Sequence, residues 1–191
     1  MITRPAVFLD RDGTLIEEVG YLDRLERMRL FPWSIDAVRL LNRAGFAVVV
    51  VSNQAGVARG FFGEPFVREV QDAIDAPVQA AGGRIDGWYY CPHHPDAPVA
   101  RYRQQCECRK PGTKLFEQAC QDLGIDAENS WMIGDQSRDI EMARRASLRS
   151  ILVQTGAAGR DGQFSASPDH IAQDLAAAAA VILQSKQAKA L

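Results

Sequence analysis

Residues 6–15 read Ala-Val-Phe-Leu-Asp-Arg-Asp-Gly-Thr-Leu, and this stretch indicates the fold. Ala6–Leu9 is an apolar run typical of a strand buried inside a parallel sheet. Asp10 and Asp12 follow two residues apart, so in an extended chain their side chains point to the same side. The Gly-Thr pair behind them requires a tight turn. In open α/β sheets ligands bind at the carboxyl ends of the strands, so we expect Asp10 and Asp12 to belong to a functional site.

The chain has 191 residues, of which 47% are hydrophobic and 24% are charged, as in an ordinary globular protein. This length suits one domain with a substantial core, and without repeats or linkers we expect residues 1–191 to form a single domain. The net charge of −2 offers no basic surface to nucleic acid or to an anionic membrane. We see no secretory signal, and no apolar run approaches the ~20 residues of a membrane span. We therefore expect a cytoplasmic monomer that binds neither nucleic acid nor membrane.

Apolar strand patterns alternate with helical patterns along the chain, which predicts an α/β fold with a doubly wound parallel sheet. Ser34 suits the N-cap of the first long helix. Pro77 is expected to end or kink the second one. We predict strands at 6–9, 46–51, 85–90, 131–133 and 148–153, and helices at 34–45, 64–81, 114–123, 137–146 and from 168 onward, with a frayed tail at 184–191.

Three further polar segments lie at or near predicted strand ends. Residues 52–54 read Ser-Asn-Gln and offer a hydroxyl and backbone N–H groups to an anion. Residues 109–110 are Arg-Lys, a pair of cations that can neutralise a phosphate. Residues 134–139 begin with Gly-Asp and end with Asp. Each segment alone also has an ordinary interpretation: a turn, a solvated pair of cations, or a helix start that favours acidic residues.

Together with the paired aspartates these segments suit phosphoryl transfer, a reaction that depends on positioning and on neutralising charge. Asp10 and Asp135 supply the oxygen ligands that Mg²⁺ prefers, and Asp10 can attack phosphorus as a carboxylate nucleophile. Asp12 is placed to protonate the leaving oxygen and then to activate water, while its backbone carbonyl contacts the metal. Ser52 and Lys110 would hold the transferring phosphoryl group.

The four segments resemble the four motifs of the haloacid dehalogenase superfamily. These motifs read Asp-Arg-Asp-Gly-Thr-Leu, Ser-Asn, Arg-Lys-Pro and Gly-Asp-x-x-x-Asp, and they span Asp10 to Asp139. The dehalogenases of the superfamily lack the second aspartate of the first motif, here Asp12, and its P-type ATPases replace it with threonine. The resemblance therefore implies the phosphatase branch.

Cysteine and histidine gather in the loop 91–110. The pattern C-x-H, twelve residues and C-x-C offers three thiolates and one imidazole, a common tetrahedral zinc set. The spacing favours His93 over the adjacent His94. Four protein ligands leave no coordination position open, so we expect a structural zinc that fixes the neighbouring Arg109 and Lys110. The expected ligands are Cys91, His93, Cys106 and Cys108.

This loop is similar to that of the zinc-containing, histidinol-phosphatase-like branch of the superfamily, and residues 18–21, 52–60 and 89–94 resemble its heptose-bisphosphate phosphatases. The resemblance implies no large cap domain, with Mg²⁺ and Zn²⁺ as cofactors. It also implies a phosphorylated sugar as substrate: heptose 1,7-bisphosphate would lose its 7-phosphate through an aspartyl-phosphate, on the route to lipopolysaccharide. Arg109 would reach the second phosphate. The implied substrate contacts are Glu18, Val19, Gly20, Tyr21, Ser52, Asn53, Gln54, Ala55, Arg109 and Lys110.

Two positions depart from the pattern of these relatives. They commonly continue Arg-Lys-Pro-x-Pro-Gly-Met, whereas residues 111–114 read Pro-Gly-Thr-Lys, so the turn that carries Lys110 differs. They often have lysine where this chain has Gln136, so one cation is missing.

Other functions remain open at this point. Histidinol phosphate is the nearest alternative substrate. Polynucleotide 3′-phosphatases share the motifs, but the acidic charge balance disfavours them. A zinc-organised interaction module with an inactive site is disfavoured because every aspartate, serine and lysine of the motifs is present.

Overall fold

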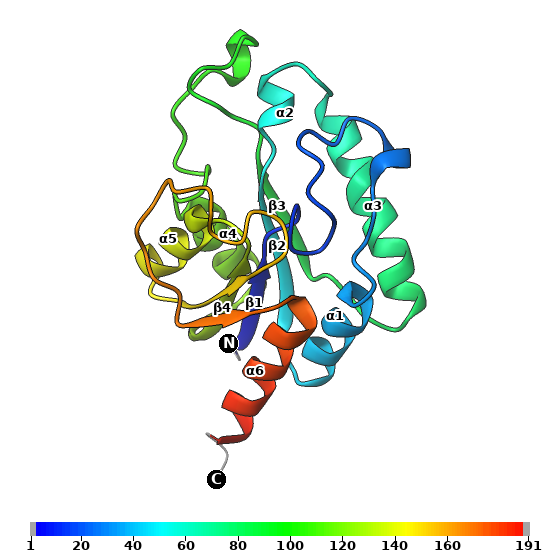
Figure 1. Cartoon of the computed structure of the whole chain (residues 1–191), viewed down its shortest axis with the longest axis vertical. Coiled ribbons are helices and arrows are strands. Elements are labelled where there is room, and N and C mark those ends of the chain that lie inside the picture. Colours follow the sequence, from blue (N-terminus) through cyan, green and yellow to red (C-terminus); the bar gives the residue numbers. More distant parts are fainter. Residues whose placement is uncertain (1–2, 189–191) are drawn as a thin grey trace.

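The computed structural model describes residues 3–188. Its centre is a parallel sheet of six strands in the order β3-β2-β1-β4-β5-β6 (Figure 1). The strands are β1 Arg4–Leu9, β2 Ala47–Asn53, β3 Gly87–Cys91, β4 Ile125–Gly134, β5 Arg149–Val153 and β6 His170–Ala172. The helices are α1 Ser34–Arg43, α2 Ala55–Ala58, α3 Glu64–Ala80, α4 Lys114–Leu123, α5 Ser137–Arg145 and α6 Leu175–Ala188, with 3₁₀ turns η1 Leu25–Arg27 and η2 Ala100–Tyr102.

Helices cover both faces of the sheet, so the predicted doubly wound α/β fold is confirmed. Val7 and Leu9 of β1 pack with α1, α3 and α6, whereas Ala6 and Phe8 pack with α4 and α5 on the other face. All four side chains are completely buried. An apolar strand with two covered faces is the pattern that the run Ala6–Leu9 predicted.

The strand order places the functional aspartates at the centre of the sheet. β1 lies between β2 and β4, and successive strands are added in one direction from β1 to β3 and in the other from β4 to β6. The crevice at such a reversal, outside the carboxyl ends of the strands, is where ligands bind in open α/β sheets. Asp10 directly follows β1 and Asp135 directly follows β4, so both lie at this reversal.

Two predictions concern helix ends, and the first of them was wrong. Ser34 is not the N-cap of α1, because Trp33 occupies that position and Ser34 is the first helical residue. Its buried hydroxyl instead donates to the carbonyl of Leu15 at 2.7 Å, which joins α1 to the loop after β1. Pro77 does not end α3, which continues to Ala80. Val78 behind it is completely buried in the core, and this packing holds the last turn in place.

The second half of the chain differs more from the prediction. β4 begins at Ile125, because Arg4 of β1 pairs with that residue, and its polar stretch gives no apolar signal. The edge strand β6 was missed, so the last helix begins at Leu175 instead of 168. The short helix α2 was missed as well. The tail predicted to fray is helical from 184 to 188, and its remainder, 189–191, lies outside the described residues.

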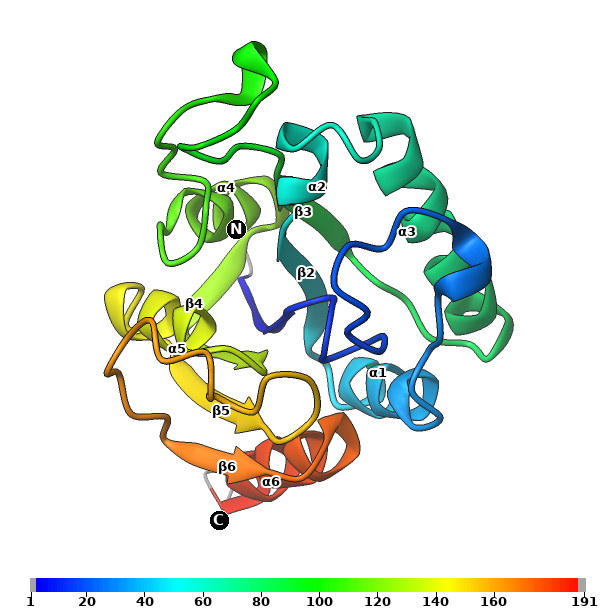
Figure 2. The same ribbon diagram turned by 45° about the horizontal axis from the view of Figure 1, so that its top comes forward.

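Long loops cover the carboxyl edge of the sheet without forming a large cap. Among residues 3–188, the connections 10–33 and 92–113 contain only the 3₁₀ turns η1 and η2 as helical structure. Figure 2 shows the second of these loops, in green, standing beside α2 at the border of the molecule. None of the helices in the described part of the chain has the length and apolar character that a membrane crossing requires.

Candidate active site and metal cluster

Three carboxylates meet where β1 and β4 end. Asp10, Asp135 and Asp139 are buried, and one oxygen of each lies within 4.8 Å of the others. The two strand ends are joined directly, because the backbone N–H of Asp10 donates to the carbonyl of Ile133 at 2.9 Å. Asp139 arrives from the first turn of α5, where its carboxylate accepts from the backbone N–H of Gln136 at 3.0 Å.

Lys110 lies against this cluster. Its Nζ is 2.9 Å from Asp10 Oδ1 and 2.6 Å from Asp139 Oδ1. It also donates to the carbonyl of Val51 at 2.8 Å, and the residue is only 3% exposed. The side chain of Asn53 holds the Lys110 backbone with two hydrogen bonds of 2.9 and 3.1 Å. The altered turn after Arg109-Lys110-Pro111 therefore still brings Lys110 to Asp10.

Glycines allow two loops to close over Asp135. Gly13 and Gly156 have positive φ angles of 79° and 57°, which other residues rarely adopt. A Cβ on Gly13 would lie 2.4 Å from Asp135 Oδ2, and one on Gly156 would lie 2.2 Å from the same atom. The backbone N–H of Ala157 donates to that oxygen at 2.7 Å. The loop after β5 thus fixes the orientation of this carboxylate, a role that no pattern in the sequence had indicated.

The crowded carboxylates favour a bound cation. Burial, which outweighs the attraction of Lys110, raises the pKa of Asp10 to about 7. Burial and the nearby Asp10 and Asp139 raise the pKa of Asp135 to about 8. Burial lowers the pKa of Lys110, but the carboxylates of Asp10 and Asp139 outweigh it and the net shift is upward. Asp135 Oδ1 is buried without a hydrogen-bond partner, so an oxygen ligand is free for Mg²⁺.

The Asp12 carboxylate is held apart from this cluster. Arg11 donates to its two oxygens through Nε and Nη2, each at 3.0 Å, and Gln54 donates at 3.1 Å. It faces a cavity of about 440 Å³ above Asp10. From this position, the Asp12 carboxylate can reach a group bound to Asp10 from the side of the cavity.

Most residues predicted to contact the substrate line this cavity. Val19 and Ser52 are exceptions, since Val19 packs against the core and Ser52 is buried, its Oγ accepting from Gln54 at 2.6 Å. The sequence analysis missed Arg59 and Arg138, two cations in the wall that no motif marked. The predicted residues in the wall are Asp10, Asp12, Glu18, Gly20, Tyr21, Asn53, Gln54, Ala55, Arg109 and Lys110.

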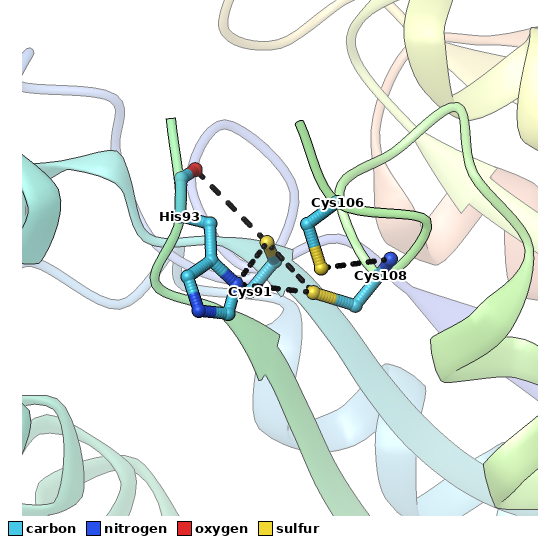
Figure 3. Close-up of side chains that lie close together, drawn as sticks. All are labelled: Cys91, His93, Cys106 and Cys108. Carbon is cyan, nitrogen blue, oxygen red and sulfur yellow. Dashed lines mark hydrogen bonds between the residues drawn. The ribbon is translucent and has the colours of Figure 1, made fainter. Parts of the chain in front are cut away.

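The four predicted zinc ligands also come together. The sulfurs of Cys91, Cys106 and Cys108 and a ring nitrogen of His93 all lie within 4.8 Å of one another (Figure 3). His93 Nδ1 is 3.7 Å from Cys91 Sγ and 3.5 Å from Cys108 Sγ. A zinc tetrahedron with the usual bond lengths has edges of roughly 3.6 Å, which these two distances match. The sulfurs of Cys91 and Cys108 lie closer, at 2.9 Å, so the donor set fits zinc and these two sulfurs would have to separate around the ion. His94 is not part of this cluster; its Nδ1 accepts from the backbone N–H of Asp96.

This cluster adjoins the cavity through the chain itself. Cys108 immediately precedes Arg109, whose Nη1 donates to the carbonyl of His93 at 3.4 Å. The same loop and the end of β3 are tied to α3, because Glu64 accepts hydrogen bonds from Tyr102 of the loop at 2.7 Å and from Tyr90 of β3 at 2.6 Å. A metal in the cluster would therefore hold one wall of the cavity.

Comparison with known proteins agrees with this geometry. A family model described as HAD-hydrolase-like matches residues 107–178. The D-glycero-beta-D-manno-heptose-1,7-bisphosphate 7-phosphatase of Yersinia pestis is 42% identical over 153 residues, covering 80% of this chain and 81% of that protein. The D-glycero-D-manno-heptose-1,7-bisphosphate 7-phosphatase of Thermosynechococcus vestitus is 43% identical over 183 residues, covering 92% and 93% of the two chains.

Solved structures show the same likeness. The crystal structure of D,D-heptose 1,7-bisphosphate phosphatase from B. bronchiseptica, complexed with magnesium and phosphate, matches with a TM-score of 0.84 and 29% identity, covering 95% of this chain and 99% of the other. A HAD-like phosphatase structure from Mesorhizobium loti matches with a TM-score of 0.81 and 30% identity, covering 95% and 87% of the two chains. Fold, site geometry and sequence identity agree, and the chain belongs to the heptose-1,7-bisphosphate 7-phosphatase family of haloacid dehalogenase-like phosphatases.

Proposed function

We propose that this phosphatase removes the 7-phosphate of D-glycero-D-manno-heptose 1,7-bisphosphate and leaves the heptose 1-phosphate. The observation that carries the proposal is the position of Lys110, held between Asp10 and Asp139 at the floor of a cavity with Arg109 in its wall. A nucleophile, a buried cation and an outer cation in one cavity suit a substrate with two phosphates. We take the identity of the sugar from the substrates named for the similar proteins.

The reaction we propose has two steps on this chain. In the first, a carboxylate oxygen of Asp10 attacks phosphorus, the bond to the sugar oxygen breaks, and Asp12 gives that oxygen its proton. In the second, Asp12 takes a proton from water, which attacks the aspartyl-phosphate and releases inorganic phosphate and free Asp10. Lys110 and Ser52 hold the phosphoryl group. Arg11 and Gln54 support this proposal because they orient Asp12 toward the cavity.

We propose that the carboxylates of Asp10 and Asp135, with the backbone carbonyl of Asp12, hold Mg²⁺. The unpartnered Oδ1 of Asp135 supports this assignment. When bound, the ion would neutralise charge on the reacting phosphate. Asp139 has a role other than metal binding, since its carboxylate keeps Lys110 charged and in place beside Asp10.

We keep the predicted substrate contacts at residues 18–21, 52–55 and 109–110 as our proposal, except Val19, whose side chain packs against the core. The two neighbouring side chains bind different parts of the protein: Lys110 donates to the carbonyl of Val51, and Arg109 donates to the carbonyl of His93. We propose that Lys110 serves the reacting phosphate and Arg109 the other one. Zinc in the adjoining cluster would then be structural, because its four protein ligands leave no position for substrate.

We also propose that residues 1–191 form one phosphatase domain with a zinc loop at 91–110, acting as a cytoplasmic monomer without nucleic-acid or membrane partners. One sheet in the described residues, four unpaired cysteines and a net charge of −2 support this proposal. Light scattering after gel filtration would measure the mass of the particle.

Phosphate release from competing substrates tests the function. The enzyme would receive heptose 1,7-bisphosphate, histidinol phosphate and a 3′-phosphorylated oligonucleotide side by side, with Mg²⁺ present. We expect kcat/KM for the bisphosphate to exceed that for the other two by at least about 10²-fold, because only it engages both cations. Equal or faster hydrolysis of histidinol phosphate would overturn the proposal. Asp10→Asn protein prepared in parallel measures any contaminating phosphatase.

A further inference from the structure

Arg138 is a cation in the cavity wall that the proposed reaction does not use. It follows Ser137 in the first turn of α5 and lines the cavity together with Arg109. Its Nε is buried and has no hydrogen-bond partner, and among residues 3–188 no ion pair to Arg138 is present. Buried polar groups in proteins are nearly always hydrogen-bonded, so this arginine is expected to have a ligand as its partner.

The other arginines of α5 show the contrast. Arg144 and Arg145 both bind the carboxylate of Glu141, at 2.8 and 2.7 Å. Arg59, which also lines the cavity, likewise has a buried Nε without a hydrogen-bond partner among the described residues, but its guanidinium lies over the ring of Tyr21 at 6.0 Å. In the described part of the chain, Arg138 has neither an ion-pairing carboxylate nor an aromatic ring under its guanidinium. Its charge is therefore left for whatever fills the cavity.

Arg138 and Arg109 both line the cavity above Asp10. Both also line an adjoining cavity of about 580 Å³, so the pair stands where the two cavities meet. Arg109 donates one hydrogen bond within the protein, to His93, and each guanidinium has five N–H groups. Two repelling cations with free donors match a group that carries two negative charges.

The pair is distinct from the cation that contacts Asp10. Asp10 has its own cation in Lys110, which is 3% exposed and also donates to the carbonyl of Val51. Gln136, two residues before Arg138, also lines the cavity but is neutral. Three other cations line the cavity, but Arg11 pairs with Asp12, Lys110 pairs with Asp10, and Arg59 lies over Tyr21. Among the described lining residues, Arg109 and Arg138 therefore remain for a second anionic group.

We propose that Arg138 is a specificity-determining residue that binds, together with Arg109, the phosphate group at the non-reacting end of the substrate. The inference rests on the proposed function for the identity of the sugar. A phosphate monoester suits the pair because it carries about two negative charges and accepts the paired hydrogen bonds that guanidinium groups donate.

Arg138→Gln and Arg138→Lys test the proposal with heptose 1,7-bisphosphate and heptose 7-phosphate, which share the reacting phosphate. We expect Arg138→Gln to raise KM for the bisphosphate about 10- to 100-fold, with a far smaller effect on the 7-phosphate, as loss of a charge-assisted hydrogen bond predicts. Arg138→Lys should recover part of the loss. Arg144→Gln removes a charge from the same helix and should leave the preference between the substrates unchanged. Equal changes for both substrates, or none, would overturn the proposal.

Calorimetric binding of heptose 1-phosphate separates this inference from the proposed function. We expect Arg138→Gln to weaken that binding while inorganic phosphate binds as before. If the wild-type protein fails to hydrolyse the bisphosphate but shows this binding difference, the function is wrong and the subsite stands. Wild-type protein that hydrolyses the bisphosphate, with no binding difference in the variant, would refute the subsite alone. Absence of heptose 1-phosphate binding in the wild-type protein would refute it as well.

Discussion

The carboxylate cluster and the Cys/His cluster are both metal-binding arrangements, but the chain holds them in different ways. Asp10 and Asp135 continue directly from the two central strands, and their positions follow from the hydrogen bonds of the sheet. In the other cluster only Cys91 ends a strand, and the remaining ligands lie in irregular chain. The first cluster is therefore organised by the fold, whereas we expect the second to depend on a metal to keep its shape.

The two clusters are connected along the chain by three consecutive residues. Cys108 belongs to the metal cluster, Arg109 to the cavity wall and Lys110 to the carboxylates. A disturbance of the loop is thus expected to reach the active site through the backbone, while a disturbance of the carboxylates leaves the loop intact. This asymmetry can be tested by changing one cluster at a time.

The largest effect is expected from Asp10→Asn. An amide is a poor nucleophile and a weak Mg²⁺ ligand, so kcat should fall by more than about 10⁴-fold, the scale seen when a nucleophile is removed. Zinc content, measured by metal analysis, should equal that of the wild-type protein. A variant that lost zinc along with activity would show that the carboxylates also support the loop, against the asymmetry.

Asp12→Asn is expected to be the next largest change. The amide keeps the shape and the backbone carbonyl but cannot transfer a proton, and general acid–base groups contribute about 10²–10⁴-fold. Turnover should fall by that factor, while calorimetry should show Mg²⁺ and substrate still binding. Hydrolysis at the wild-type rate would contradict the assignment of acid and base to Asp12.

Cys106→Ser tests the other cluster. Removing one of the four ligands should lower zinc content, and kcat/KM should drop about 10- to 100-fold because Arg109 and Lys110 lose their support. Cys120→Ser is the matched control, since that cysteine lies on α4 outside the cluster. Normal kinetics in Cys106→Ser protein that lacks zinc would show that the fold alone organises the loop.

Glu64→Gln should have the smallest effect of these substitutions. It tests the hydrogen bonds that attach the loop to α3 without any metal. Hydrogen bonds from Tyr90 and then from Tyr102 lower the pKa of Glu64, so its contribution to stability is present at neutral pH and is lost as the pH falls below its ordinary value of 4.5. Urea unfolding should show a loss of about 1 kcal/mol at pH 7 and a smaller loss at pH 4.

Glu69→Gln serves as the control for this measurement. Glu69 lies exposed on the same helix, so its substitution should leave the free energy of unfolding nearly unchanged. An equal loss at both pH values in Glu64→Gln would mean that the charge of Glu64 does not matter to the loop.

Much of the fold was predictable because its signals are local. The apolar runs of β1 and β2 and the helical spacing in α4 and α5 each carry their own periodicity, and parallel strands of a sheet end at one edge. That rule alone placed Asp10 near Asp135. The edge strand β6 was missed because three residues beside the polar Asp169 give no periodicity, and it exists through its pairing with β5.

The amino-acid sequence by itself determined the central strands of the sheet, the phosphatase motifs and the candidate metal ligands, since each depends on residue type and spacing along the chain. Only the tertiary structure decided that Asp139 would bind Lys110, that the loop with Gly156 would close over Asp135, and that Arg138 would face the cavity without a partner. These contacts join segments far apart in the sequence or depend on which way a side chain turns. Packing of the whole chain sets both, and no local pattern records them.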